Sequence, residues 1–198
     1  ALPFLAAWAV APGCAYLLSC STKPRRRELA PEDRDLLMDV ARRTWEYFET
    51  LAGPENHWLA PDNVQEDRVP RVAHRTSPTN LGLGLLATLS AHDLGLISLE
   101  DMAERLDRAL TSIEGLERHE GHLFNWYDTQ NLTPLLPRYV STVDSGNLAG
   151  ALLALAAGCR ELDKQLQASR PEIASRLADV AVRSVALADG MNFAFLYE

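Results

Sequence analysis

Apolar residues recur at helical spacing in five segments of the chain, and these segments are of two kinds. Residues 31–51, 99–116 and 170–187 each carry an apolar face and a charged face, which predicts amphipathic helices. Residues 79–94 and 146–162 are apolar around most of their circumference, which predicts helices buried on most sides. The two kinds alternate along the chain. This alternation is typical of a layered helical array in which outer helices cover inner ones.

The segments between these helices show little regular pattern. Residues 55–72 have no sustained period and contain several prolines, which predicts a long irregular loop of the kind that often carries function in a compact domain. Residues 122–127 form a short apolar and aromatic run, which predicts either a small strand or an extended loop. Strand content is otherwise negligible, so the fold class is all-α.

The first 22 residues contain no charged side chain, and such a run is long enough to cross a membrane as a helix. Lys23, Arg25, Arg26 and Arg27 follow at once, which places the remainder of the chain in the cytoplasm. A signal peptide or a lipoprotein cleavage site at Cys20 fits less well, because both need positive charge before the apolar run. The expected domains are a transmembrane helix at 1–22, a basic cytoplasmic junction at 23–30 and a helical domain at 31–198.

Composition narrows the class of protein. The chain has 198 residues, 47% of them hydrophobic, and a net charge of −8, which fits one globular domain with a sizeable core. The acidic balance argues against a nucleic-acid partner. Cys14, Cys20 and Cys159 lack the spacing of a metal site. We therefore expect no metal and no cofactor, and we expect Cys159 to be a small core residue.

Two polar clusters precede the apolar helices. One is the sequence HRTSPTN at residues 74–80, and the other lies between residues 121 and 150, where aromatic, amide, hydroxyl and carboxylate side chains are concentrated. Flat aromatic faces and convergent hydrogen-bonding groups are what a sugar site requires. The alternative interpretation is a polar loop in which Asp144 and Ser145 simply cap the following helix. If helix pairs present their N-terminal ends at one end of the array, the two clusters converge on one cavity.

Individual residues have alternative interpretations. Arg75 has two interpretations: it pairs with Asp128 or Asp144 and fixes the floor of the pocket, or it forms a purely structural ion pair, which is favoured. Trp126 and Tyr127 point to opposite sides of an extended segment, so one is expected to stack on a sugar and the other to fill the core. The predicted substrate-binding residues are Asp62, Asn63, His74, Arg75, Thr76, Ser77, Asn80, Asn125, Trp126, Tyr127, Asp128, Tyr139, Ser141, Asp144, Ser145 and Asn147.

Several longer motifs carry a family resemblance. They are RRTWEYFE, HWLAPDN, HRTSPTNLGL, NWYDT, YVSTVDSGNLAG and DGMNFAFLYE. Together they resemble the glycoamylase-like cyclisation, or transglycosylation, region of bacterial cyclic β-1,2-glucan synthases. The resemblance extends over nearly the whole chain. It implies an (α/α)6 barrel, and the five predicted helices would form its first half, with the final motif continuing into a larger domain.

The resemblance also implies an activity. The region would bind a linear β-1,2-glucan and close it to a ring by retaining transglycosylation, as part of a larger enzyme of the bacterial inner membrane. Its partners would be the glucan chain, the membrane and the rest of the synthase polypeptide, with glycosyltransferase and phosphorylase-like domains. The principal catalytic acids are expected beyond residue 198, with Asp128 and Asp144 as candidates within the chain, so the chain alone is expected to be inactive. The alternatives are a noncatalytic carbohydrate-binding scaffold and a related β-1,2-glucan hydrolase.

Overall fold

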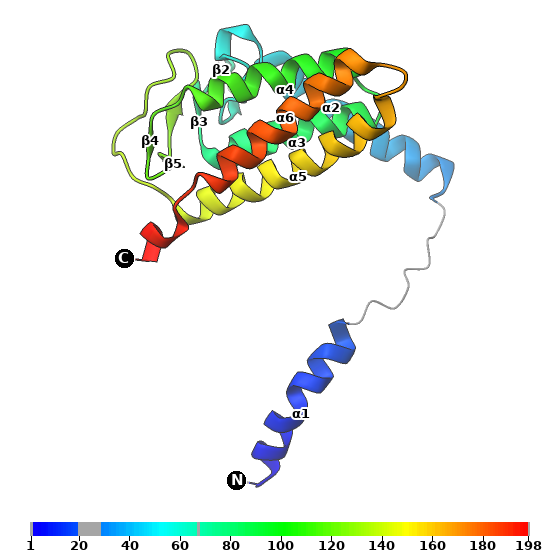
Figure 1. The fold of residues 1–198 in the computed structure, drawn as a ribbon, viewed down its shortest axis with the longest axis vertical. Coiled ribbons are helices and arrows are strands. Elements are labelled where there is room, and N and C mark those ends of the chain that lie inside the picture. The colour runs from blue at the N-terminus through cyan, green and yellow to red at the C-terminus, as the bar shows by residue number, and fades with distance from the viewer. Residues whose placement is uncertain (1, 20–28, 67, 198) are drawn as a thin grey trace. The chain divides into compact units, whose positions relative to one another are not determined.

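The computed structural model describes residues 2–19, 29–66 and 68–197 (Figure 1). The chain divides into two compact units, residues 1–36 and residues 37–198. The first unit contains helix α1 (Leu2–Ser19) and the start of α2 (Pro31–Leu51). Among the described residues, no helix has both the length and the apolar character needed to cross a membrane. The predicted transmembrane helix is therefore not confirmed, and residues 23–28 of the predicted basic junction lie outside the described ranges.

The second unit is built on four helices that follow α2: α3 (Pro78–Asp93), α4 (Leu99–Glu114), α5 (Thr142–Leu166) and α6 (Pro171–Asp189). Helix α5 packs against α3 and α6, and α4 packs against the same two helices. Leucines from all four helices meet in the core between them, together with Met102 and Ile113 of α4. Cys159 of α5 is fully buried there, as predicted, and this burial raises the pKa of its thiol to about 12.

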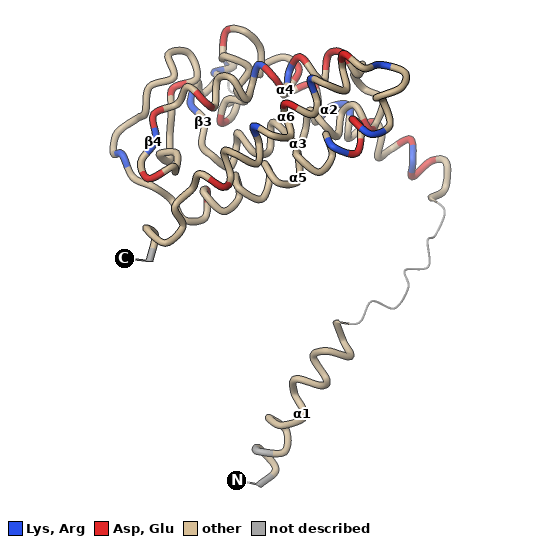
Figure 2. Tube along the Cα trace, viewed as in Figure 1, with Lys and Arg blue, Asp and Glu red and all other residues tan. Residues whose placement is uncertain are grey.

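The predicted alternation of helix types is confirmed. Charged residues are concentrated on α2, α4 and α6, whereas α3 carries one only at its last residue, Asp93, and most of α5 has none (Figure 2). Helix α4 shows the consequence clearly, because its buried positions recur at helical spacing while its charged residues lie on the opposite face. The apolar stretches of α3 and α5 can therefore pack against each other without desolvating a charge.

Serine side chains begin three of these helices. Ser77, Ser98 and Ser141 accept hydrogen bonds from the backbone N–H groups three residues later, and this satisfies donors that the first turn leaves unpaired. Helix α5 therefore begins at Thr142, four residues before the predicted start. The interpretation of Asp144 as the helix cap is wrong, because Ser141 takes that role and Asp144 lies in the first turn.

The described residues of this unit also form three two-stranded antiparallel sheets. Strand β1 (Val64–Gln65) pairs with β2 (Arg71–Val72), β3 (Arg75–Thr76) with β6 (Tyr127–Asp128), and β4 (Arg118–His119) with β5 (His122–Leu123). Short 3-10 helices η1 (Pro54–Asn56) and η2 (Phe193–Tyr197) lie in the connections. The run at residues 122–127 therefore contains β5 and the first residue of β6, and the predicted loop at 55–72 contains β1 and β2.

The β4–β5 hairpin is held by a two-residue turn in which both residues have positive φ, 50° at Glu120 and 80° at Gly121. This turn type matches the twist of the strands it joins. A Cβ atom on Gly121 would lie 1.9 Å from the carbonyl oxygen of Gly190. Glycine is therefore required here both by the backbone conformation and by the close approach of the end of α6.

Helix ends and short strands lie together at one end of the second unit. Helices α3 and α5 begin where α4 and α6 end, and strands β3, β4 and β5 lie at that same end (Figure 1). The β3–β6 pairing joins residues that are about fifty positions apart in the sequence. Both polar clusters of the sequence are thus brought to the N-terminal ends of the two apolar helices.

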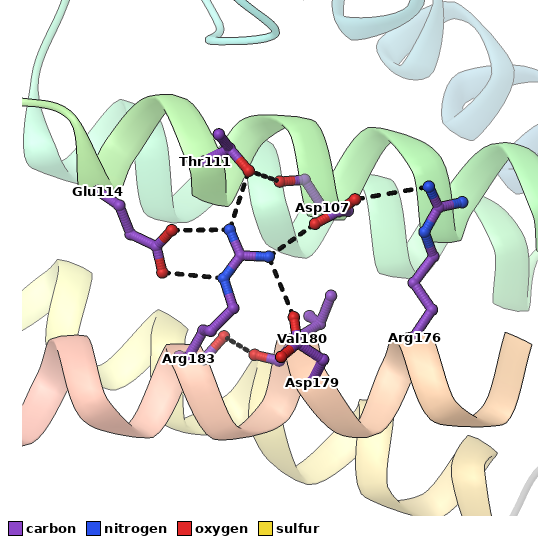
Figure 3. A network of polar contacts seen from close by, with 8 residues as sticks. Asp107, Thr111, Glu114, Arg176, Asp179, Val180 and Arg183 are labelled. Carbon is purple, nitrogen blue, oxygen red and sulfur yellow. Dashed lines mark hydrogen bonds and ion pairs between the residues drawn. The ribbon is translucent and has the colours of Figure 1, made fainter.

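A different polar network joins α4 and α6 on their outer side (Figure 3). The guanidinium of Arg183 donates to both carboxylate oxygens of Glu114 at 2.9 and 2.8 Å, and to Asp107 at 2.6 Å. It also donates to Asp179 and to the hydroxyl of Thr111. The hydrogen bond to Glu114 is the main reason that the pKa of Arg183 is raised above its usual value.

Candidate functional site

The β3–β6 pairing places the two polar clusters side by side, as predicted. In its register Arg75 lies opposite Asp128, and Thr76 lies opposite Tyr127. The backbone N–H of Thr129 extends the contact by donating to the carbonyl of His74 at 3.1 Å. Backbone pairing of this kind fixes the relative position of the flanking side chains. We define the site cluster as ten side chains around this pairing: Asp62, Asn63, Arg75, Thr79, Asn80, Asn125, Trp126, Tyr139, Asp144 and Asn147.

Asp62 is the acceptor at one side of the site cluster. Its Oδ2 accepts from Nε and Nη2 of Arg75 at 3.1 and 2.9 Å, and from the amide of Asn63 at 2.8 Å. Its Oδ1 accepts from the amide of Asn80 at 3.2 Å. The side chain of Asp62 is 19% exposed. One carboxylate thus holds donors from β3, from the first turn of α3 and from its own loop.

Arg75 forms its ion pair with Asp62, and the interpretation in which its partner is Asp128 or Asp144 is wrong. Two backbone hydrogen bonds, from Asp62 N to Ala73 O and from Ala73 N to Asn63 O, bring the loop against the residues before β3. Asp62 is consequently the carboxylate within reach of Arg75. The carboxylate of Asp128 instead accepts from two backbone N–H groups of the turn that follows it, which is the usual role of an aspartate at a turn.

Arg75 also contacts an aromatic ring of the other cluster. Its guanidinium carbon lies 4.7 Å from the centroid of the Trp126 ring, within the range of a cation–π interaction. The guanidinium therefore connects Asp62 with Trp126 and supports the indole from one side. Trp126 itself is half-buried.

Asp144 is the acceptor at the other side of the site cluster. Its Oδ1 accepts from the hydroxyl of Thr79 at 2.6 Å. With the Asn125 amide oriented to satisfy its neighbours, its nitrogen donates to Oδ2 of Asp144 at 3.1 Å. The Asn125 oxygen then accepts from the Tyr139 hydroxyl at 2.7 Å and from the indole N–H of Trp126 at 2.5 Å. Buried Asn125 thus positions one carboxylate and two aromatic rings.

Two further residues connect the starts of α3 and α5. The amide of Asn147 donates to Oγ1 of Thr79 at 3.1 Å, and Thr79 in turn donates to Asp144. Two adjacent residues at the start of α3 thereby hold the two carboxylates: Thr79 donates to Asp144, and Asn80 donates to Asp62. The site cluster contains two carboxylates and one guanidinium, with amide and hydroxyl groups between them.

A buried network supports the site cluster from behind. Asn56 Oδ1 accepts from the hydroxyl of Thr129 at 2.7 Å and from Nδ1 of His74 at 2.8 Å, while its amide donates to the carbonyl of Leu51 at 2.8 Å. His57 Nδ1 donates to the carbonyl of Thr129 at 2.9 Å. Asn56 and Thr129 are almost completely buried. The side chain of Asn56 thus fixes His74, the residue before β3. Polar networks whose hydrogen bonds are satisfied make the surrounding structure rigid.

Five predicted binding residues are buried in this structure and do not face solvent. They are Thr76, Ser77, Asn125, Tyr127 and Ser145. The hydroxyl of Tyr127 donates to the carbonyl of Glu117 and accepts from the N–H of Phe124, so Tyr127 is the core-filling member of the aromatic pair. Burial raises the pKa of its hydroxyl to about 12. Ser145 contacts His122, with Oγ 3.0 Å from Nδ1, and Ser141 is used as the cap of α5.

Two hollows adjoin the site cluster. One, of about 380 Å³, is lined by Thr79 and Asn147 together with apolar and glycine positions of α3 and α5. The other, of about 480 Å³, includes Tyr139 and lies next to η2. Of the site cluster, the exposed or half-buried predicted residues are Asp62, Asn63, Arg75, Asn80, Trp126, Tyr139, Asp144 and Asn147. Tyr139 and Asn147 line the hollows. Within the described residues, no group of three or more potential ligands is placed to hold a metal ion.

The arrangement suits a neutral polyhydroxylated ligand. Carboxylate oxygens accept from hydroxyl groups, amides donate and accept, and an aromatic face packs against C–H groups. Asn56, Thr79 and Thr129 were not predicted as site residues. Thr79 lies within the HRTSPTN motif, so the sequence could have indicated it as a site residue. The role of Asn56 depends on contacts with residues that are distant in sequence, and no local pattern indicates it.

The chain is similar to known proteins over most of its length. It is 45% identical over 161 residues to the cyclic beta-(1,2)-glucan synthase NdvB of Rhizobium meliloti, and the match covers 81% of this chain and 6% of that protein. An endo-beta-1,2-glucanase from Chitinophaga pinensis, in complex with sophorotriose and glucose, has the same fold with a TM-score of 0.60. It is 20% identical, and the match covers 81% of this chain and 37% of the glucanase.

A beta-1,2-glucanase from Parabacteroides distasonis also shares the fold, with a TM-score of 0.60 at 15% identity over 76% of this chain and 20% of that protein. The chain thus spans only a small part of the synthase. It spans little more than a third of the Chitinophaga pinensis glucanase and a fifth of the Parabacteroides distasonis glucanase. The predicted resemblance to the glycoamylase-like region of cyclic β-1,2-glucan synthases is confirmed. A family model described as "Protein of unknown function (DUF3131)" matches residues 39–167, and the chain therefore belongs to that family.

Proposed function

We propose that this region binds a β-1,2-linked glucan at the site cluster and takes part, within a larger synthase, in closing the glucan to a ring by retaining transglycosylation. The observation that carries the proposal is the convergence of Asp62, Trp126 and Asp144 around the β3–β6 pairing. The 45% identity to a cyclic glucan synthase supports the choice of substrate.

The proposed roles follow from the contacts. Trp126 offers an aromatic face to a sugar ring, and Arg75 keeps the indole in place from one side. Asp62 and Asp144 each accept hydrogen bonds from protein donors on both oxygens. Their remaining lone pairs are available to sugar hydroxyl groups. These carboxylates bind and orient the chain.

Retaining transglycosylation needs a proton donor at the glycosidic oxygen and a second carboxyl group that stabilises the oxocarbenium-like transition state. Asp128 does not suit either role, because its carboxylate is used by the turn after β6. Asp144 is oriented by Thr79 and Asn125 as a hydrogen-bond acceptor. We infer that the principal catalytic acids belong to other parts of the larger enzyme. The chain alone is then expected to bind glucan without forming rings.

Calorimetric titration of the chain with linear β-1,2-glucan tests the binding proposal. Trp126→Ala is expected to weaken binding by about 1–3 kcal/mol, because the buried ring face is lost. Val182→Ala, at an exposed position of α6, is the control and should bind as the unmodified chain does. Equal binding by the Trp126→Ala variant, or equal binding of a β-1,4-linked glucan, would contradict the proposed site.

Asp144→Asn separates a ligand role from a structural one in the whole synthase. The amide retains an oxygen that can accept from Thr79 but changes the charge and the pattern of donors. Ring formation is expected to fall more than thermal stability does. A lower melting temperature with normal turnover of the folded enzyme would show that Asp144 only supports the start of α5.

A noncatalytic carbohydrate-binding scaffold is the second candidate, and it is favoured by the use of Asp128 in a turn. The two candidates differ in turnover by the whole protein. If Trp126→Ala lowers glucan binding but ring formation stays unchanged, the region is a scaffold. Loss of ring formation in the same variant supports the transglycosylase role. A hydrolase would instead release linear products from the same glucan.

We further propose the inner membrane as the location, with residue 23 onward in the cytoplasm. The uncharged run at 1–22 and the four basic residues that follow support this topology. A reporter fused after Arg27 should be active only if it functions in the cytosol. Activity of a reporter that works only in the periplasm would reverse the proposed orientation.

A further inference from the structure

Apart from Tyr139 itself, the hollow beside Tyr139 is lined by residues that the binding proposal does not use. Its volume is about 480 Å³, within the range of small-ligand sites. It lies between the β4–β5 hairpin, the segment before α5 and the 3-10 helix η2. We call it the aromatic trough, and its principal residues are His119, Phe124, Arg138, Tyr139 and Phe195.

The aromatic trough begins where the site cluster ends. Tyr139 belongs to both, because its hydroxyl donates to Asn125 while its ring lines the trough and is 48% exposed. The carbonyl of Tyr139 also accepts from the backbone N–H of Asn125 at 2.9 Å. Two hydrogen bonds therefore fix the distance between the Asp144 side of the site cluster and the first ring of the trough.

Aromatic rings of β4 and η2 also line the trough. The ring of His119 meets that of Phe195 edge to face, with centroids 5.0 Å apart. His122, buried behind them, meets Phe193 in the same way at 5.1 Å. These contacts hold η2 against the β4–β5 hairpin. The lining of the trough is therefore rich in aromatic rings, a composition that suits ligands with flat C–H faces.

The charge of the trough favours a neutral ligand. Arg138 is its only guanidinium among the lining residues, and its Nη1 lies 2.8 Å from a carboxylate oxygen of Glu117. The same guanidinium lies over the Phe124 ring at 5.7 Å. Because Glu117 already pairs with its charge, Arg138 offers hydrogen-bond donors but attracts an anionic ligand little.

The geometry points to the aromatic trough as an extension of the sugar site that binds further glucose units of the same glucan chain. This inference rests on the proposed function of the site cluster. A chain held at Trp126 and Asp144 continues past Tyr139 into the trough. There, sugar faces pack against Tyr139 and Phe195, and hydroxyl groups accept from Arg138 and His119. Affinity for β-1,2-linked oligosaccharides should consequently increase with chain length.

Calorimetric titrations with the β-1,2-linked disaccharide and with a longer linear oligosaccharide test the inference. Phe195→Ala and His119→Ala should each weaken binding of the longer ligand about tenfold, the effect of one lost aromatic contact with its buried area. Binding of the disaccharide should be unchanged. Leu136→Ala is the matched control, because Leu136 is 85% exposed and lies in the same loop as Tyr139 without lining the trough.

The outcomes separate the two proposals. If neither oligosaccharide binds the unmodified chain, the proposed function itself fails, and the extension fails with it. If both bind but the variants bind the longer ligand as well as the control does, the site cluster stands and the trough extension is overturned. His119 is exposed, so its variant keeps the test decisive even if Phe195→Ala lowers stability.

Discussion

The site cluster and the α4–α6 network are both dense in charged groups, but they are built differently. In the α4–α6 network one guanidinium satisfies carboxylates that all project from two packed helices (Figure 3). In the site cluster the groups come from loops, short strands and two helix starts, and buried amides such as Asn125 and Asn56 position them. The first arrangement joins two helices. The second orients groups that keep unused hydrogen-bonding capacity toward solvent.

The difference shows which polar features indicate function. Asp107 and Glu114 carry carboxylates just as Asp62 and Asp144 do, yet both are used by the same arginine. Ion pairs between helices are common structural features and do not by themselves mark a site. Side chains from loops that a buried network holds in place are a stronger indication, because that is how scaffolds position ligand groups.

The largest effect is expected at the buried support of the site cluster. Asn56→Ala removes three hydrogen bonds and leaves Thr129 and His74 without this partner. Unsatisfied buried polar groups are costly, so the free energy of unfolding should fall by about 2–4 kcal/mol. Urea denaturation measures this change. Asn131→Ala, in an exposed turn, is the control. If both variants lose the same free energy of unfolding, Asn56 contributes no more to stability than an ordinary loop residue.

The stability of the protein at alkaline pH should depend on Tyr127, which is buried beside the site cluster. The folded pKa of Tyr127 is about 12, above its ordinary value of 10.0. The unfolded chain therefore loses this proton first, and stability that is full below pH 10 should fall by about 2–3 kcal/mol as the pH rises to 12. Tyr127→Phe lacks this contribution. Denaturation curves at pH 8 and pH 11 should show a smaller decline in the variant, and an equal decline would assign the alkaline loss to other groups such as Cys159.

The α4–α6 network should matter for stability and not for ligand binding. Arg183→Ala leaves Glu114, Asp107 and Asp179 without their shared partner. Because the arginine side chain is 20% exposed, we expect a loss of about 1–2 kcal/mol, below the value for a fully buried pair. Arg43→Ala breaks an exposed pair with Asp39 and should change stability little. Weaker glucan binding by the Arg183→Ala variant would show that the two regions are coupled.

The smallest effect is expected on α5 beside the site cluster. A Cβ atom on Gly146 would meet no other atom within 4 Å. Gly146→Ala should therefore stabilise the helix by about 0.5–1 kcal/mol, because alanine has the higher helix propensity. Thermal unfolding measures the gain. Gly146 also lines the hollow with Asn147, so a loss of glucan affinity in a more stable variant would extend the ligand-binding surface along α5.

Local patterns in the sequence determined the helices and their types. Apolar periodicity located all five helices that follow α1, and the spacing of charged residues along the chain distinguished apolar α3 and α5 from amphipathic α2, α4 and α6. These features depend on residues within one or two turns of each other. The motifs around the two polar clusters were sufficient for the family resemblance that the comparisons confirm.

Tertiary contacts decided how the site is assembled. The sequence indicated that Asp62, Arg75 and Asp144 belong to a site, but the choice of Asp62 as the partner of Arg75 depends on backbone pairing between Asp62 and Ala73. Likewise, which member of the Trp126–Tyr127 pair is buried depends on the register of β6 against β3. Pairings between residues that are distant in sequence are set by the packing of the whole unit, because no local preference distinguishes one carboxylate or one aromatic ring from another.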